Sequence, residues 1–190
     1  MKHRIVGDHN QVIAFELEQP DELLVFNGVM IFTRGNADLR EGERNFPETG
    51  LPAAGLLVSP EGSGIAGIKP AREGHLKRFD IGPPAASIVD VRSVFALTKG
   101  ISVRAYKPEP DIALKFGERK YVVLSGAGAA FLRTKENFLE FTLGEGESLK
   151  AYIEHVVSFS ENLQIKPEAA SRGRGWFIFD GPGKLILSTA

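Results

Sequence analysis

The feature of this sequence that most constrains the fold is a succession of short apolar runs that recurs along the chain. Residues 75–82 (HLKRFDIG) align with residues 138–144 (FLEFTLG), and counterparts lie 62 positions apart. Residues 96–103 align with residues 158–165 at the same spacing. Self-similarity at a fixed spacing is typical of a chain built from repeated structural units.

A third and weaker copy of the pattern opens the chain. Residues 15–17 correspond to the first aligned motif, and residues 25–31 correspond to the second. The repeated unit is therefore an alternating strand, a polar excursion and two strands across a tight turn. We expect a single all-β domain over residues 1–190, with three pseudo-repeats at roughly 1–54, 55–118 and 119–190.

The apolar runs predict about fourteen short strands. So many strands must curl into a barrel or a stacked sandwich, because an open sheet would leave long unpaired edges. The best helical pattern covers residues 147–157, but the repeat favours strands there. The predicted strands cover residues 11–17, 23–34, 55–59, 65–68, 75–81, 87–97, 101–106, 120–124, 127–133, 138–143, 149–152, 155–159, 163–165, 176–179 and 185–187.

Glycine and asparagine punctuate these runs and predict hairpin turns. Both residue types tolerate positive φ, as tight turns require. We expect hairpins across Asn27-Gly28, Lys99-Gly100, Ser125-Gly126 and residues 181–183. Residues 34–54 are polar and rich in Gly and Pro, so we expect a long surface loop there, with an interface role as the alternative.

The composition excludes several classes of function. The 190 residues include no cysteine, which removes disulfides, Cys-ligated zinc and a cysteine nucleophile. The net charge of −1 favours neither nucleic acid nor an anionic membrane. The first eleven residues lack the apolar core of a signal peptide, and no apolar run approaches the roughly 20 residues of a membrane span. We expect a cytoplasmic protein with no transmembrane segment, and peripheral membrane contact stays open.

The four histidines are too scattered to predict a metal centre. They are His3, His9, His75 and His155, and no two have the close spacing of a metal-binding pair. A double-stranded β-helix of the cupin type would need several imidazoles converging on one ion. Glu154 is adjacent to His155, but neighbours on a strand face opposite ways. We expect a hydrogen-bonded histidine at His155 and assign no metal or cofactor.

No catalytic residue is predicted either. The glycine-rich segments at residues 62–64, 126–128 and 144–146 join strands and lack the Gly-Lys-Ser/Thr of a phosphate-binding loop. Ser125 lacks the preceding glycine and the following helix of a nucleophile elbow. The paired carboxylates Asp21-Glu22, Glu109/Asp111 and Glu145/Glu147 lie in predicted turns, where carboxylates are usually solvated.

One basic and aromatic segment allows a nucleic-acid interpretation. Arg172, Arg174 and Trp176 could stack on bases, and Lys77-Arg78 and Arg119-Lys120 add positive charge. Without an overall basic surplus the electrostatic contribution would be small. We expect instead a loop that leads into a strand with Trp176 in the core.

Several motifs of the second half resemble one known family. They are residues 94–101 (VFALTKGI), 122–132 (VVLSGAGAAFL), 143–147 (LGEGE), 155–159 (HVVSF) and 179–187 (FDGPGKLIL). Together they resemble bacterial relatives of the mitochondrial biogenesis family named for altered inheritance of mitochondria. That family is grouped with the tryptophan RNA-binding attenuator protein in a TRAP-like fold.

The resemblance implies a short double-stranded β-helix in three TRAP-like pseudo-repeats, often assembled as a homotrimer. It implies no reaction and no site residue. This chain departs from the family pattern at residues 40–48, where the usual insertion is rich in glycine, and at Ala151-Tyr152, where Val-Asp is common. The leading hypothesis is a non-enzymatic oligomeric scaffold or interaction protein. The alternatives are a cupin-like metalloenzyme and an RNA- or small-ligand-binding module.

Overall fold

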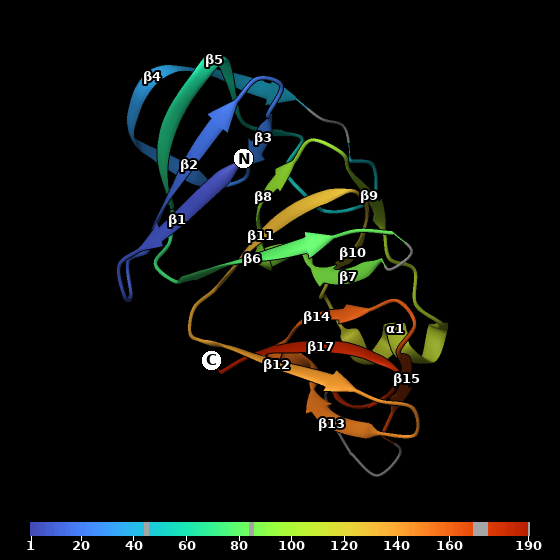
Figure 1. Cartoon of the computed structure of the whole chain (residues 1–190). Helices are drawn as coiled ribbons and strands as arrows, with labels where there is room; N and C mark the ends of the chain where they lie inside the picture. Colours follow the sequence, from blue (N-terminus) through green and yellow to red (C-terminus); the bar gives the residue numbers. More distant parts are fainter. Residues whose placement is uncertain (44–45, 84–85, 169–174, 190) are drawn as a thin grey trace.

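The computed structural model describes residues 1–43, 46–83, 86–168 and 175–189, and it confirms an all-β fold. The described residues form seventeen strands in three sheets, with one short α-helix and two 3-10 turns. The chain descends in Figure 1 from the N-terminal strands to the C-terminal ones, and helix α1 (Pro110–Phe116) lies beside the last third. None of the described helices is long and apolar enough to cross a membrane.

The first sheet has eight strands and forms a nearly closed, barrel-like layer. Its hydrogen-bonded path runs β1-β2-β5-β3-β8-β11-β6, and β4 pairs with β5 off this path. All the pairings are antiparallel. The strands are β1 (Lys2–Val6), β2 (Val12–Glu18), β3 (Leu23–Val25), β4 (Gly28–Glu43), β5 (Ala54–Pro70), β6 (His75–Ile81), β8 (Val94–Thr98) and β11 (Gly128–Thr134).

The other two sheets contain most of the second half of the chain. The six-stranded sheet has the order β12-β17-β14-β7-β10-β9, and the three-stranded sheet has the order β13-β16-β15. The six are β7 (Ser87–Asp90), β9 (Ile101–Ala105), β10 (Tyr121–Gly126), β12 (Phe138–Leu143), β14 (Val156–Ser160) and β17 (Gly183–Ser188). The three are β13 (Ser148–Tyr152), β15 (Gln164–Pro167) and β16 (Trp176–Asp180).

The recurrence seen in the sequence returns as a recurring order of elements. After β6 the chain forms β7, the 3-10 turn η1 (Val91–Ser93) and β8. After β12 it forms β13, the 3-10 turn η2 (Ile153–His155) and β14. The turn η2 begins 62 positions after η1, and β14 begins 62 positions after β8. The aligned sequences have the same spacing. The division of the chain at residues 54 and 118 stays a prediction.

The predicted hairpins are wrong, although the strands beside them are present. Strands β8 and β9 flank Lys99-Gly100, yet β8 pairs with β3 and β11 while β9 pairs with β10. The strands flanking Asn27-Gly28, Ser125-Gly126 and residues 181–183 likewise pair with other strands. Three of these turns carry the chain into another sheet, whereas the strands on either side of Asn27-Gly28 both pair with β5. A turn residue reverses the backbone but does not specify which strand will be the neighbour.

Two of these turns require glycine because they contact each other. Gly100 and Gly126 have φ values of +95° and +101°. A Cβ atom on Gly126 would lie 2.2 Å from the backbone oxygen of Gly100, and one on Gly100 would lie 2.5 Å from that of Ala127. The crossings from β8 to β9 and from β10 to β11 therefore stack backbone on backbone, which only residues without a side chain allow.

The predicted loop over residues 34–54 is also wrong in its first part. Strand β4 continues to Glu43 and pairs with β5 along its length. Strand β5 is continuous through the segment around Gly62 that was expected to separate two strands. Irregularities in the register, between Met30 and Phe32 and between Gly35 and Ala37, let this long ribbon bend. Polar, glycine-containing strands of this kind lack the apolar alternation on which the prediction depended.

The predicted strand over residues 87–97 is wrong, because the 3-10 turn at Val91–Ser93 divides it into β7 and β8, which belong to different sheets. The remaining strand predictions are confirmed to within a few residues. Strands β6 and β12 have the predicted bounds, and residues 147–157 form β13, η2 and the start of β14 rather than a helix. Two elements were missed. They are β1, whose residues alternate between exposed and half-buried, and α1, which begins at Pro110 where only a strand end was expected. Proline is favoured in the first turn of a helix.

The core has three apolar clusters that follow the sheets. One is centred on Phe15, Phe95 and Phe131 inside the first sheet. A second, around Val122 and Leu132, lies between the first sheet and the six-stranded sheet. The third, beneath the three-stranded sheet and α1, contains Phe116, Phe159, Phe177 and Phe179 among others. In β10, which is buried on both faces, successive side chains alternate between two clusters: Val122 and Leu124 belong to the second, and Tyr121 and Val123 to the third.

Candidate functional site

A cleft lies where the two 3-10 turns meet the ends of strands from the first sheet. Its volume is about 650 Å³, which is within the range of roughly 300–1,000 Å³ typical of small-molecule sites. The turn after β3, the segment after β5, the end of β11, both 3-10 turns and the end of β17 contribute to it. The lining includes Phe26, Asn27, Pro70, Arg72, Asp90, Arg92, Val94, Phe95, Arg119, Arg133, Lys135, Glu154, His155, Val156 and Ser188.

The two 3-10 turns have nearly the same backbone. The residue before η1, Asp90, has φ −61° and ψ 123°, and the residue before η2, Tyr152, has φ −83° and ψ 126°. In each turn the amide after the last residue donates to the carbonyl of the first. Only the first turn has a side-chain cap, because the Asp90 carboxylate accepts from the amide of Arg92 at 2.9 Å.

Asp90 is the centre of a charged cluster. Its side chain is only 3% exposed, and its carboxylate accepts hydrogen bonds from two arginines. Arg92 donates from Nη2 at 2.7 Å and from Nε at 3.2 Å. Arg119 donates from Nη1 at 3.0 Å. A buried carboxylate needs partners of this kind to remain charged, and the bond to Asp90 in turn raises the pKa of Arg92.

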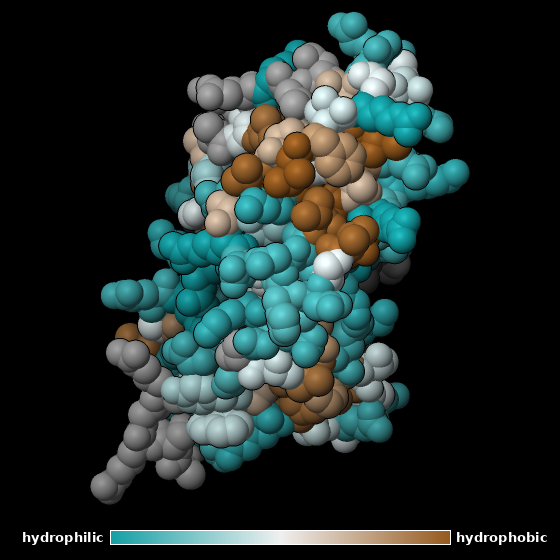
Figure 2. Space-filling model, turned by 90° about the vertical axis from the view of Figure 1, so that its left-hand side faces the viewer, coloured by the Kyte–Doolittle hydropathy of each residue, from teal (hydrophilic) through white to brown (hydrophobic). Residues whose placement is uncertain are grey.

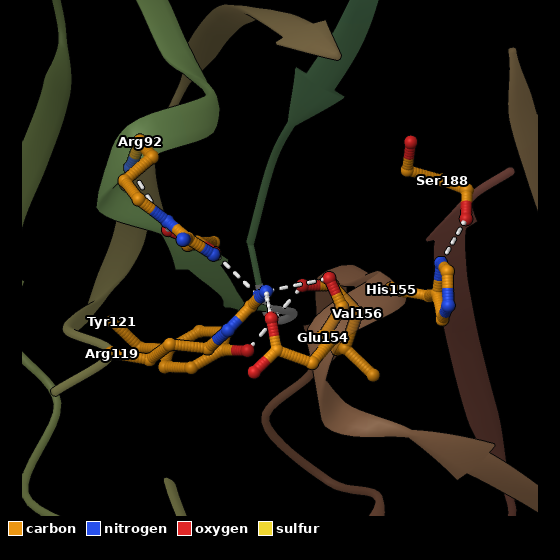
Figure 3. Close-up of polar contacts among 8 residues, drawn as sticks. Arg92, Arg119, Tyr121, Glu154, His155, Val156 and Ser188 are labelled. Carbon is orange, nitrogen blue, oxygen red and sulfur yellow. Dashed lines mark hydrogen bonds and ion pairs between the residues drawn. The ribbon is translucent and has the colours of Figure 1, made fainter. Parts of the chain in front are cut away.

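Arg119 links the two 3-10 turns (Figure 3). Besides Asp90, its Nη2 donates to the backbone oxygen of Glu154 at 2.6 Å and to the Glu154 carboxylate at 2.9 Å. The side chain of Arg119 is 10% exposed, and its Nε is buried without a hydrogen-bond partner among the described residues. Such an orphaned donor is uncommon in folded proteins.

Tyr121 joins the same cluster from β10. Its hydroxyl donates to the backbone oxygen of Val156 at 3.3 Å, and the side chain is buried. Burial raises the pKa of Tyr121 well above its ordinary value, the negative charge of Asp90 raises it further, and Arg119 partly offsets both. Tyr121 is therefore a neutral hydrogen-bond donor at physiological pH.

Three further cations line the cleft. Arg72 follows β5, Arg133 is near the end of β11, and Lys135 follows that strand. We call these three residues the cationic rim. No carboxylate in the described part of the chain forms an ion pair with any of them. Burial lowers the pKa of Arg133, and the charge of Arg72 lowers it further.

The histidines do not form a metal centre in the described ranges. His155 lies in the cleft, where its Nδ1 donates to the backbone oxygen of Ser188 at 3.1 Å. The rings of His9 and His75 are 6.0 Å apart, a contact that the sequence did not predict. Among the described residues, no group of three or more His, Asp or Glu side chains could hold a metal ion. The described residues therefore provide no set of ligands for a metal site of the cupin type.

The other residues considered from the sequence have ordinary structural surroundings. Ser125 is on β10 opposite Ser102, and Glu147 accepts from the amide of Gly144 at 2.6 Å within its own turn. Trp176 was expected in the core, but it is 41% exposed and lies 5.0 Å from the Lys150 ammonium group. Arg172 and Arg174 are outside the described residues.

Sequence reasoning missed the charged cluster. A signal was present, because Arg92 and Glu154 occupy equivalent positions of the 62-residue recurrence and have opposite charges. Nothing in the sequence around Arg119 indicates that its side chain reaches both turns.

A second surface of interest is an apolar face on β4. Val29, Ile31 and Phe32 are 44%, 50% and 45% exposed. Figure 2 shows brown side chains gathered over the N-terminal part of the molecule. The irregular register between Met30 and Phe32 makes Ile31 an extra residue, so two consecutive apolar side chains reach solvent.

The fold and the cleft together define a class: an all-β protein of recurring strand and 3-10 units, with an ion-paired cleft between units. The sequence matches the model of the mitochondrial biogenesis AIM24 family over residues 3–190, and the chain belongs to that family. A search of curated proteins found no match.

Solved structures with a similar fold include an X-ray crystal structure of a protein from Streptococcus pyogenes, with a TM-score of 0.75 and 14% sequence identity. The similarity covers 100% of this chain and 93% of that one. At this identity the likeness concerns the fold alone.

Proposed function

We propose that the protein is a non-enzymatic scaffold or interaction protein that assembles with copies of itself, most favourably as a homotrimer. The observation that carries the proposal is the apolar face of Val29, Ile31 and Phe32 on β4. Contiguous exposed apolar residues on a folded protein commonly mark a contact surface. The family resemblance implies the same assembly.

The backbone of β4 supports self-association as well. Within the described ranges, β4 pairs only with β5, so its other edge is unpaired. Unpaired edges are templates for pairing with another strand, and proteins usually shorten, charge or cover them. At the start of β4 the edge is apolar instead. A second copy of this chain could cover it with a strand or with apolar side chains.

The position of Phe32 explains why this face stays open in the single chain. A Cβ atom on Gly67 of β5 would lie 2.1–2.6 Å from atoms of the Phe32 ring, so the ring rests directly on the glycine backbone. The ring is supported from one side, and its other side is available to a partner. A closed trimer requires this face to contact a different surface of the next copy, whereas pairing of β4 with β4 would give a dimer.

Light scattering on the purified protein tests the proposal. We expect a mass three times that of the 20.7 kDa chain. Phe32→Asp and Ile31→Asp should each yield the single-chain mass with unchanged far-UV circular dichroism. Leu114→Asp is the matched control, because Leu114 is 82% exposed on α1, and its assembly should be unaffected. A monomeric wild-type protein would refute the proposal, and a dimer would refute the trimer.

A cytoplasmic location belongs to the same proposal. It is supported by the absence of cysteine and by the near-neutral net charge. Fractionation of cells that produce the protein from its own gene would test it, and recovery with the membrane fraction would contradict it.

A further inference from the structure

The cationic rim has more positive charge than the cleft neutralises. The cleft contains two carboxylates, those of Asp90 and Glu154. Asp90 accepts from Arg92 and Arg119, and Glu154 accepts from Arg119. These four charges balance one another. The three cations of the rim remain, and the neighbouring Glu73 and Glu136 do not line the cleft or form an ion pair with them.

Arg133 is held in place by the main chain. Its Nη1 donates to the backbone oxygen of Glu73 at 2.9 Å, and its side chain is partly buried. Burial lowers the pKa of Arg133, and repulsion by the nearby charge of Arg72 lowers it further. An anion between the two guanidinium groups would remove this repulsion and satisfy donors that the protein does not use. Guanidinium groups bind planar or tetrahedral oxyanions with paired hydrogen bonds.

The rest of the cleft is too large and too apolar for a free ion. Its volume of about 650 Å³ exceeds that of an inorganic anion several-fold. Val94, Phe95, Val156 and Val157 also line the cleft, each with at most 5% of its surface exposed, and form its apolar wall. As a separate observation, the buried Nε of Arg119, a residue that lines the cleft, has no hydrogen-bond acceptor among the described residues.

We propose that this cleft binds a small organic phosphate. The phosphate group lies at the cationic rim, between Arg72, Arg133 and Lys135, and the organic part lies along the apolar wall. A phosphate monoester has a charge of about −1.5 to −2 at pH 7. It therefore neutralises the three cations of the rim more fully than a ligand with a single carboxylate would. The proposal goes beyond the scaffold function and does not depend on the oligomeric state.

Titration of the full chain with phenyl phosphate and with inorganic phosphate tests the proposal. Amide shifts in nuclear magnetic resonance spectra report where the probe binds. We expect saturable shifts at Ala71-Arg72 and at Thr134-Lys135. Phenyl phosphate should bind at least fivefold more tightly than inorganic phosphate because its ring gains contact with the apolar wall. Equal affinities would refute an organic ligand.

Substitutions that remove one charge identify the rim. Arg72→Gln and Lys135→Gln change exposed side chains, so both variants should fold, and each should weaken phenyl phosphate binding about tenfold. Arg104→Gln is the matched control, because Arg104 is an exposed arginine of β9 that pairs with Glu161 away from the cleft. Its affinity should equal that of the wild-type protein.

Three outcomes would overturn the proposal. They are absence of saturable binding at millimolar phenyl phosphate, equal weakening in Arg104→Gln, and binding of a single-stranded oligonucleotide with no binding of either phosphate probe. Light scattering on the same variants separates this proposal from the scaffold function, because rim substitutions should leave the assembled mass unchanged.

Discussion

The turns η1 and η2 have the same backbone and different chemistry. Each follows a strand, closes with the same amide-to-carbonyl bond and leads into a buried valine, Val94 or Val156. At equivalent positions, however, the first turn has Asp90 and Arg92, and the second has Tyr152 and Glu154. The recurrence determines the path of the chain, and the differences between the copies determine where charge is placed.

Arg119 shows what this difference makes possible. It bonds to Asp90 before η1 and to Glu154 within η2, so one cation connects two recurring units through carboxylates that are not equivalent. Two identical turns could not provide this asymmetric pair. The cleft is therefore lined by two distinct charged groups: the ion pairs around Asp90 and the cationic rim.

Replacing Asp90 should have the largest effect. Asp90→Ala removes the cap of η1 and leaves the nearly buried Arg119 without its main carboxylate. We expect the free energy of unfolding to fall by about 3 kcal/mol, at the lower end for loss of one partner of a buried ion pair, because Arg119 keeps Glu154. Chemical denaturation monitored by circular dichroism measures this change.

The equivalent substitution in the second turn is the control. Tyr152→Ala removes a half-buried ring that lies 5.5 Å from Trp176, but no cap and no ion pair. We expect a loss of about 1 kcal/mol. Equal losses at Asp90 and Tyr152 would show that the two turns contribute alike and that the charged cluster adds no stability.

Removing the Tyr121 hydroxyl should have a smaller effect that depends on pH. Tyr121→Phe loses the bond to Val156 and should reduce the free energy of unfolding by about 1 kcal/mol at pH 8. Burial raises the pKa of Tyr121 in the folded protein. This raised pKa contributes to the free energy of unfolding. The contribution is fully present below the unfolded-state pKa of about 10, and it is lost as the pH rises above that value.

The variant cannot ionise at this position, which makes the pH dependence testable. Above pH 10 the wild-type protein should lose about 1.4 kcal/mol per pH unit through Tyr121. The difference between the two proteins should therefore vanish or reverse at pH 11. Denaturation at pH 8, 10 and 11 measures this difference in the free energy of unfolding. A difference that stays constant would mean that the folded state does not keep the Tyr121 hydroxyl protonated.

Glu154→Gln should have the smallest effect. The Glu154 side chain is 45% exposed, and Arg119 also bonds to its backbone oxygen, which the substitution retains. We expect a change of about 0.5 kcal/mol or less, as for exposed ion pairs. A loss as large as that for Asp90→Ala would mean that the two carboxylates contribute equally, contrary to the asymmetry described above.

The local elements of the fold could be predicted from the sequence, and the partners of those elements could not. The bounds of β6 and β12 follow from alternation and recurrence, because the period of a strand is a local property. The crossings at Gly100 and Gly126 resembled hairpins, because a glycine turn has the same local signature whichever strand becomes the neighbour. The polar β4–β5 ribbon was missed because its stability depends on pairing rather than on an apolar face.

For the candidate site, the sequence contained one signal: Arg92 and Glu154 lie 62 positions apart in the recurrence and have opposite charges. The turns that carry them were not predicted, because residues 87–97 were expected to form one strand. The tertiary structure was needed to show that Arg119 reaches both turns and that Arg72, Arg133 and Lys135 line the same cleft. These contacts join residues from strand ends and turns far apart in the chain. Their proximity depends on how the sheets stack, which no local pattern encodes.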